Sequence, residues 1–265
     1  MFRRTVTLTS GTQKIESPPF DIHFQLRFDN EAEPNVAVID VFNLSQETIN
    51  KFNRGQNVIL NAGYEGDSGT ILAGTIDEVS SFWEVGRGSG NERIMRLEVN
   101  DALGRWTSTN INKTYKAGIK ASQIIRDMLN MFGLEIGALQ LPNDVNYENG
   151  RTFSGTLQTA LLQVVSDTGA RLHISNGAIF VQPSDKGERI AFVLGADTGL
   201  IESPERIDSE EGERWRVTSL LNYRIKPNTI IKIDSINTQG FFRVVKGEHV
   251  CGDQDFDTRM EVVSA

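Results

Sequence analysis

The feature that most constrains this chain is the stretch Val36–Val79, which predicts a strand, a short helix and a long two-stranded ribbon. The segment Val36–Phe42 is almost continuously apolar, as is typical of a strand covered on both faces. Ser45 is placed to cap a helix of about two turns, because its hydroxyl accepts from the first free amides of a helix. Gly55 is suited to end that helix, because glycine tolerates a left-handed conformation. The stretch therefore predicts a β-module with one small helix.

The ribbon continues this β pattern. Its strands are predicted at Val58–Tyr64 and Thr70–Val79, and the five residues Glu65–Gly69 between them hold two glycines, which is typical of a hairpin with a longer loop. Strict alternation of Ile22, Phe24, Leu26 and Phe28 indicates a half-buried strand with His23 on its wet face. Further strands are predicted at Arg4–Thr9, Ser81–Val85 and Arg93–Asn100. Many short strands with regular turns indicate a small sandwich or barrel.

The character of the chain changes near Asp101. Residues 106–117 are irregular, and apolar stripes then predict helices at Lys120–Phe132 and Thr156–Thr168, the second capped by Ser154 or Thr156. Between the two helices, Leu139–Gly150 is expected to be a loop. The dipeptide Asn176-Gly177 predicts a hairpin between the strands 171–175 and 178–182. These elements predict a compact α+β module.

After Pro183 the pattern returns to β. Five strands are predicted there: Ile190–Leu194, Arg214–Leu221, Ile230–Ile236, Gly240–Gly247 and Asp257–Val263. The predicted fold is therefore α+β and mainly β, with two small β-barrel or sandwich modules at residues 1–102 and 185–265. The α+β module at residues 103–184 is inserted between them.

Composition excludes several classes of protein. The net charge of −8 argues against a protein that grips nucleic-acid phosphates, although like charge suits a surface past which a polyanion slides. A single cysteine, Cys251, permits neither an intrachain disulfide framework nor a cysteine-type zinc site, and it suggests folding in a reducing cytoplasm. The N-terminus has no apolar core typical of a signal peptide. No run approaches the ~20 apolar residues of a membrane span, so no membrane insertion is expected.

The chain offers three histidines for metal or acid–base chemistry: His23, His173 and His249. The nearest approach to a ligand or nucleophile cluster is His249 with Cys251 and Asp253. Alternate residues of a strand supply only one side of a coordination sphere, and no second ligand cluster or orienting group is evident. We therefore predict no metal site, no cofactor and no cysteine nucleophile.

Two other motifs, an acidic segment and a glycine-rich segment, are better explained by ordinary surface structure than by a catalytic or binding site. Residues 202–213 carry six acids, and a solvated, mobile loop explains them more simply than a glycosidase carboxylate pair does; they are Glu202, Glu205, Asp208, Glu210, Glu211 and Glu213. The glycine-rich segment 86–90 lacks both the Lys-Ser/Thr ending and the following helix of a phosphate-binding loop, which makes it a hairpin tip. No catalytic residue is predicted, and the chain is not expected to be an enzyme.

Two adjacent aromatic pairs lie in predicted strands, Phe82 with Trp83 and Phe241 with Phe242. Neighbours on a strand point to opposite faces, so one member of each pair is expected to be exposed. A core residue with an edge contact is one interpretation, and a subunit interface is the other. All four residues are candidates for that interface.

The order of these features resembles the hub proteins of phage tail baseplates, related to the hub of contractile tails and to relatives in prophages and bacteriocins. The resemblance spans most of the chain, although no catalytic motif carries it. The resembling segments are Val36–Phe52, Gly55–Tyr64 and Leu72–Ile76, then Ile119–Gly133 and Ser154–Ile179, and finally Gly199–Pro204, Ser219–Asn222, Gly240–Val244 and Gly247–Thr258. Longer members extend beyond the equivalent of Ala265, which puts an appended domain in doubt.

The resemblance implies a homotrimer in which two tail-tube-like modules per subunit make a six-fold-like ring. That ring would join a hexameric tail tube to a trimeric spike and let DNA pass without specific binding. Implied partners are the tube protein, the central spike, the tape-measure protein and other baseplate proteins. The implied location is the virion tail, assembled in the bacterial cytoplasm.

Two alternatives stay open on sequence alone. The first is a cell-wall-degrading tail enzyme that uses acids such as Glu210 or Glu211. The second is a carbohydrate- or receptor-binding module at the tail tip, in which an aromatic residue such as Trp83 stacks on a sugar.

Overall fold

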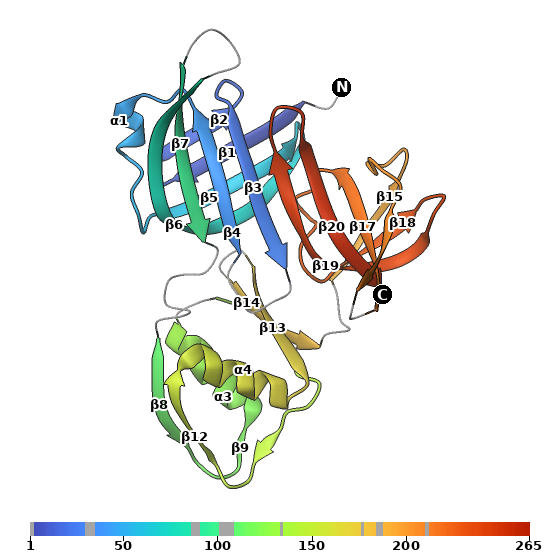
Figure 1. Cartoon of the computed structure of the whole chain (residues 1–265). Coiled ribbons are helices and arrows are strands. Elements are labelled where there is room, and N and C mark those ends of the chain that lie inside the picture. The colour runs from blue at the N-terminus through green and yellow to red at the C-terminus, as the bar shows by residue number, and fades with distance from the viewer. Residues whose placement is uncertain are drawn as a thin grey trace. The chain divides into compact units, whose positions relative to one another are not determined.

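The computed structural model describes residues 3–29, 35–85, 91–100, 109–132, 135–175, 178–183, 188–209 and 212–265 (Figure 1). The chain is mainly β, with an α+β unit inserted between its first and last thirds, which confirms the predicted fold class. Unit one comprises Met1–Asp29, Asn35–Asp101 and Gly187–Ala265, and unit two comprises Asn30–Pro34 and Ala102–Lys186. The first and last thirds share unit one, so their separation into modules at residues 1–102 and 185–265 stays a prediction.

Within the described residues of unit one, thirteen strands form one sheet. The order is β16-β17-β20-β19-β3-β4-β7-β6-β5-β1-β2, and β18 lies between β19 and β15. The strands of the first third are β1 (Arg4–Ser10), β2 (Gln13–Ser17), β3 (Ile22–Asp29), β4 (Val36–Phe42), β5 (Asn57–Tyr64), β6 (Asp67–Val85) and β7 (Asn91–Asn100). Those of the last third are β15 (Glu188–Gly195), β16 (Glu205–Ser209), β17 (Gly212–Leu220), β18 (Thr229–Asp234), β19 (Gln239–Cys251) and β20 (Phe256–Ser264).

The two thirds meet where β3 pairs with β19 in antiparallel register, from Phe24 opposite Cys251 to Asp29 opposite Lys246. Each third also sends residues into the other's core. Cys251 and Phe256 of the last third belong to the apolar cluster built on β1–β7, and Phe28 belongs to the cluster built on β17–β20. This exchange of buried side chains makes the β3–β19 seam an integral part of unit one.

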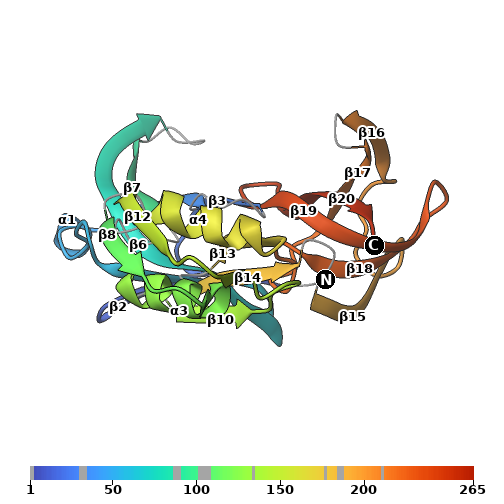
Figure 2. The same cartoon turned by 90° about the horizontal axis from the view of Figure 1, so that it is seen from below.

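The sheet of unit one is strongly curved. Beyond β6 it turns back, so that β5, β1 and β2 lie behind β4 and β3 (Figure 1). The apolar cluster with Leu8, Ile39 and Leu60 fills the space between these layers. Hairpins β6–β7 and β16–β17 both rise on the side away from β2 (Figure 2). The face of the sheet that points away from the core is therefore its concave face.

Strand β4 and the helix after it differ from prediction in detail. Ala37, Ile39 and Val41 are buried, but Val36 is half exposed, so the expectation that both faces of β4 are covered is wrong. Helix α1 (Gln46–Ile49) has four residues and is shorter than predicted. Its predicted cap is confirmed, because Ser45 Oγ accepts from the amide of Thr48 at 3.1 Å.

The β5–β6 hairpin is tighter than its sequence indicated. Tyr64 pairs with Asp67, which leaves a two-residue turn in place of the predicted five-residue loop. Gly66 occupies this turn with φ of +85°, a conformation that side chains disfavour. Strand β6 then continues through Val85 and pairs first with β5 and later with β7. Strand β2 was not predicted at all.

Unit two packs two helices, α3 (Ala121–Phe132) and α4 (Leu157–Asp167), into a core with short sheets, as predicted. Thr156, one of the two proposed caps, accepts from the amide of Thr159. The expected irregular segment 106–117 and loop 139–150 are wrong in part, because each contains a strand. The strands are β8 (Asn110–Tyr115), β9 (Ile119–Lys120), β10 (Glu135–Leu139), β11 (Asn146–Tyr147), β12 (Arg151–Thr156), β13 (Ala170–Ser175) and β14 (Ala178–Pro183).

In the last third, the predicted strands are present, but the acidic segment 202–213 is not simply a mobile loop. Glu205–Ser209 forms β16 and pairs with β17. The carboxylate of Glu205 lies 2.9 Å from Arg216, and that of Glu213 lies 3.6 Å from Arg206, so arginines of the same hairpin neutralise these acids. Among the described helices, none is long and apolar enough to cross a membrane.

Candidate functional site

The inside of the curved sheet carries a nearly continuous layer of charged side chains. Cross-strand register places Asp40 beside Arg96, Glu248 beside Arg259 and Lys246 beside Glu261. The Asp40 carboxylate accepts two hydrogen bonds of 2.7 Å from Arg96, and this bonding raises the pKa of the guanidinium. This face, from β7 across β4, β3, β19 and β20 to β17, is called the charged face below.

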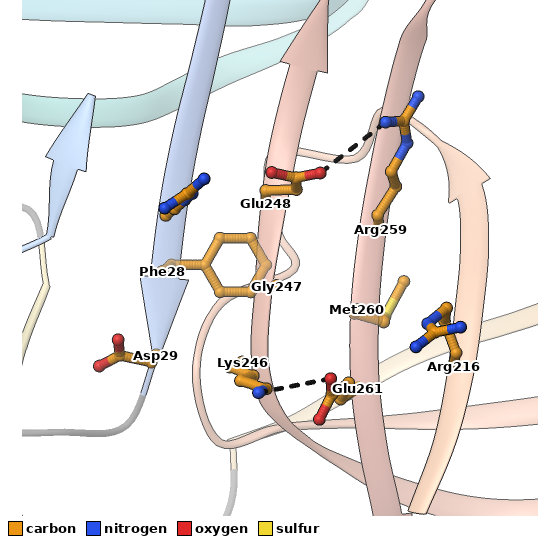
Figure 3. A pocket seen from close by; sticks show the side chains of 10 residues that line it. Phe28, Asp29, Arg216, Lys246, Gly247, Glu248, Arg259, Met260 and Glu261 are labelled. Atoms are coloured by element: carbon orange, nitrogen blue, oxygen red, sulfur yellow. Dashed lines mark ion pairs between the residues drawn. The ribbon is translucent and has the colours of Figure 1, made fainter. Parts of the chain in front are cut away.

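The middle of the charged face contains a hollow of about 370 Å³ over the β3–β19 seam. Phe28, Gly247 and Met260 contribute to its lining, and the ion pairs Lys246–Glu261 and Glu248–Arg259 lie beside them (Figure 3). Their separations are 3.4 and 3.8 Å. Pairs this open to water are worth about 0–1 kcal/mol each. Their main effect is to surround the cations of this face with acids.

The opposite face of the β6–β7 hairpin is apolar where it leaves the core. Met95 and Leu97 of β7 are fully buried, and they lie opposite Ser81 and Val79 of β6. The same face continues outward to Trp83 and Val85, which are 61% and 81% exposed. The guanidinium of Arg93 lies 4.6 Å from the centre of the Trp83 ring. Large exposed apolar side chains that extend a core face are typical of a contact surface.

The other predicted aromatic residues divide as strand alternation requires. Phe82 is half-buried on the charged face, with Arg96 5.2 Å from its ring centre. Phe242 is 4% exposed and belongs to the core of the last third, whereas Phe241 is 63% exposed. The β18–β19 turn beside Phe241 presents Ile236, which is fully exposed. One member of each pair is therefore available on the surface, and the interface role of all four stays a prediction.

The structure does not bring His249, Cys251 and Asp253 together. His249 is buried, its ring nitrogens lie 2.9 Å from Thr258 Oγ1 and 3.2 Å from the carbonyl of Ile225, and desolvation lowers its pKa to about 4. Burial raises the pKa of Cys251 to about 12, so this thiol stays protonated and is a poor nucleophile. Asp253 lies beyond the end of β19 and faces His23 instead. No side chain of His173 is described.

The remaining candidates are placed as follows. Glu202 is exposed, and Glu205 and Glu213 pair with arginines. Asp208, Glu210, Glu211 and the glycine-rich tip 86–90 lie outside the described side chains. The charged face was missed by sequence reasoning, although β20 signals it, because Asp257, Arg259 and Glu261 alternate with Thr258, Met260 and Val262.

Solved structures with a similar arrangement of elements include two tail proteins. A 43 kDa tail protein of prophage MuSo2 from Shewanella oneidensis is 10% identical, with a TM-score of 0.72 over 98% of this chain and 97% of that one. A tail protein from Neisseria meningitidis MC58 is 9% identical, with a TM-score of 0.69 over 98% and 96%. The chain has the fold of phage tail proteins.

The tail-protein fold also occurs in a secretion system. The c3393 protein of E. coli, a component of the type VI secretion system described as similar to the T4 tail proteins gp27 and gp5, is 13% identical to this chain. Its TM-score is 0.69, over 97% of this chain and 76% of that one. No protein-family model matches the sequence, and no curated protein matches it significantly. The likeness is therefore evident in the structure although the sequences are only 9–13% identical. It confirms, at the level of fold, the resemblance to phage tail proteins that the sequence indicated.

Proposed function

We propose that the protein is the structural hub of a phage tail baseplate or of a related tail-like particle. In this proposal, three copies close into a ring that adapts a hexameric tail tube to a trimeric spike. The tape-measure protein and other baseplate proteins contact the same ring. Likeness to tail proteins over nearly the whole of both chains supports this proposal.

The observation that carries the proposal is the pair of exposed apolar hairpins, one from each third of unit one. Trp83 and Val85 project on β6–β7, and Phe241 and Ile236 project on β18–β19. Two such surfaces on one chain suit a closed cyclic assembly, in which each surface of one subunit meets a surface of the next. Six such modules from three chains would match the symmetry of a hexameric tube.

The charged face suits the lining of a channel for DNA. Four of its cations, Arg96, Arg216, Lys246 and Arg259, lie in ion pairs with neighbouring acids. Arg27, which also lines the hollow, is an exposed fifth cation. Tight binding of DNA requires cations that replace its counterions, and a cation already held by a carboxylate does this poorly. We propose that this face lines the lumen and lets DNA pass without specific binding.

The alternatives receive less support from the described residues. Two acids of the segment 202–213, Glu205 and Glu213, pair with arginines, and the acids named for the enzyme alternative, Glu210 and Glu211, lie outside the described residues. Trp83 is exposed, as stacking on a sugar requires, so the sugar-binding alternative calls for a test. One side of its ring, however, already faces the guanidinium of Arg93, which lies 4.6 Å from the ring centre. A glycan-binding screen of the full chain distinguishes that role from assembly, because a hub of this kind is expected to bind no glycan.

The oligomeric state tests the hub proposal. Mass measurement by light scattering, alone and after co-expression with a candidate spike protein, should give three chains per particle. The double variant Trp83→Glu/Phe241→Glu should give monomers with an unchanged circular dichroism spectrum. The matched control Ile59→Glu alters an exposed apolar residue of β5, opposite Ala73 and ten positions along β6 from Trp83, and should keep the trimer. A monomer under every condition, with or without the spike, would contradict the proposal.

A further inference from the structure

Three potential metal ligands from opposite ends of the chain lie together beside the β3–β19 seam. His23 is the second residue of β3, Asp21 immediately precedes that strand, and Asp253 belongs to the turn between β19 and β20. His23 Nε2 lies 3.3 Å from Asp21 Oδ1 and 3.5 Å from Asp253 Oδ1. All three ligand atoms lie within 4.8 Å of one another.

These distances do not suit a simple ion pair. A charge-assisted N–H···O bond is about 2.7–2.9 Å long, and one imidazole N–H cannot point well at two carboxylates. Ligand atoms about 2.0–2.2 Å from a tetrahedral metal ion lie about 3.3–3.6 Å from one another. Both separations from His23 fall in that range, and the two carboxylates lie within 4.8 Å of each other. The three side chains are therefore close enough together to share one metal ion.

The fold holds each ligand in place. The ring of His23 packs edge-on against Phe42, with 4.7 Å between ring centres. The backbone carbonyl of Asp21 accepts from the amide of Phe42 at 3.0 Å. The turn that carries Asp253 is closed by a hydrogen bond from the amide of Gly252 to the carbonyl of Asp255, also 3.0 Å. Binding a metal would therefore order little additional backbone.

We propose that Asp21, His23 and Asp253 form a site for a divalent transition-metal ion, with zinc as the best fit. One imidazole and two carboxylates are ligands that zinc accepts, and magnesium and calcium favour all-oxygen sites. The side chains of His23 and Asp253 are 22% and 29% exposed and that of Asp21 is 61% exposed, so solvent can supply the remaining coordination positions. The bound ion clips the first third of the chain to the last third.

Calorimetric titration of the chelator-treated full chain with zinc chloride tests this site directly. We expect one zinc per chain and a melting temperature that rises by about 5 °C when free zinc is a hundred times Kd, because the ion binds the folded state alone. His23→Asn and Asp253→Asn should each weaken binding at least tenfold. Magnesium chloride at the same concentration should give no heat and no rise.

A matched control keeps the test specific. Asp255→Asn removes a carboxylate of the same turn that lies 2.8 Å from Arg259, and it should leave zinc binding unchanged. Circular dichroism of each variant without metal verifies that it folds. Absence of binding at millimolar zinc would mean that the three residues form an ion pair only. Undiminished binding to the folded His23→Asn variant would place the metal elsewhere and overturn the proposal.

Discussion

Asp67 accepts hydrogen bonds from both terminal amino groups of Arg224, at 2.7 and 3.0 Å, across 157 positions of the chain. The pair joins the β5–β6 turn to the segment between β17 and β18. The Arg224 guanidinium also lies 4.2 Å from the ring centre of its neighbour Tyr223, and that ring in turn occupies the space beside Gly69. The first and last thirds are thus joined at a second place, away from the β3–β19 seam.

The contact between Tyr223 and Gly69 should tolerate no added carbon. Gly69→Ala places a β-carbon inside the Tyr223 ring volume, and we expect a loss of about 1–3 kcal/mol in the free energy of unfolding. Urea denaturation measures this loss. The double variant Gly69→Ala/Tyr223→Ala should lose less than the sum of the two single variants. Additive losses would show that the clash lies elsewhere.

The seam should be equally sensitive at Gly247. A β-carbon there would lie 2.7 Å from the ring of Phe28 and closer still to the backbone of Arg259. Gly247→Ala is therefore expected to cost about 1–3 kcal/mol of stability. Gly252→Ala is a matched control one residue beyond the end of this pairing, because the nearest atom to its new carbon lies 3.9 Å away. Thermal unfolding of the two variants should differ by several degrees.

His249 should make the protein sensitive to acid. Its folded pKa is about 4 and its unfolded pKa is about 6.5, so between these values the unfolded chain binds a proton that the folded chain does not. Stability contributed by the neutral ring is complete above pH 6.5 and falls by about 1.4 kcal/mol per pH unit below it. Between pH 7.5 and 4.5, His249→Gln should lose about 2–3 kcal/mol less than the unmodified protein. Urea denaturation at both pH values measures this difference. If the variant and the unmodified protein lose the same free energy of unfolding between pH 7.5 and 4.5, His249 is not the cause of the acid sensitivity.

The charged face should acquire DNA affinity when its acids are removed. Glu248→Gln/Glu261→Gln frees Lys246 from its ion pair and removes one of the carboxylates around Arg259, which keeps Asp255 and Asp257 as partners. We expect this variant to bind double-stranded DNA at least tenfold more tightly than the unmodified chain, with an affinity that falls steeply as salt rises. The variant Glu47→Gln/Glu65→Gln changes the net charge equally but lies outside this face. Fluorescence anisotropy that rises equally for both variants would indicate an effect of net charge alone.

Much of the fold could be predicted because local patterns agree with tertiary packing. Alternation located β3, and capping residues located α1 and α4. Strand β16 escaped because Glu205, Arg206 and Asp208 have the composition of a loop. Its stability as a strand depends on partners across the hairpin, such as Arg216, and no local pattern reports them. Strand β8 escaped because only Ile111 and Tyr115 reach the core.

The candidate surfaces were predictable only in part. Alternation alone indicates that one residue of each aromatic pair is exposed, and the structure shows this for Trp83 and Phe241. Alternation does not show which member of each pair is the exposed one. The grouping of His23 with Asp253 was beyond reach, because it depends on the pairing of strands from opposite ends of the chain. A sequence places such residues together only when the whole topology is known.

The position of β19 beside β3 has a consequence for synthesis. Gln25 donates a hydrogen bond of 2.7 Å to Glu248, 223 positions later in the chain. During translation, one edge of β3 therefore stays unsatisfied until β19, which ends at Cys251, has left the ribosome. Such long-range closure makes folding slow and exposes a strand to wrong neighbours meanwhile. A nascent chain truncated before residue 239 should thus be prone to aggregation.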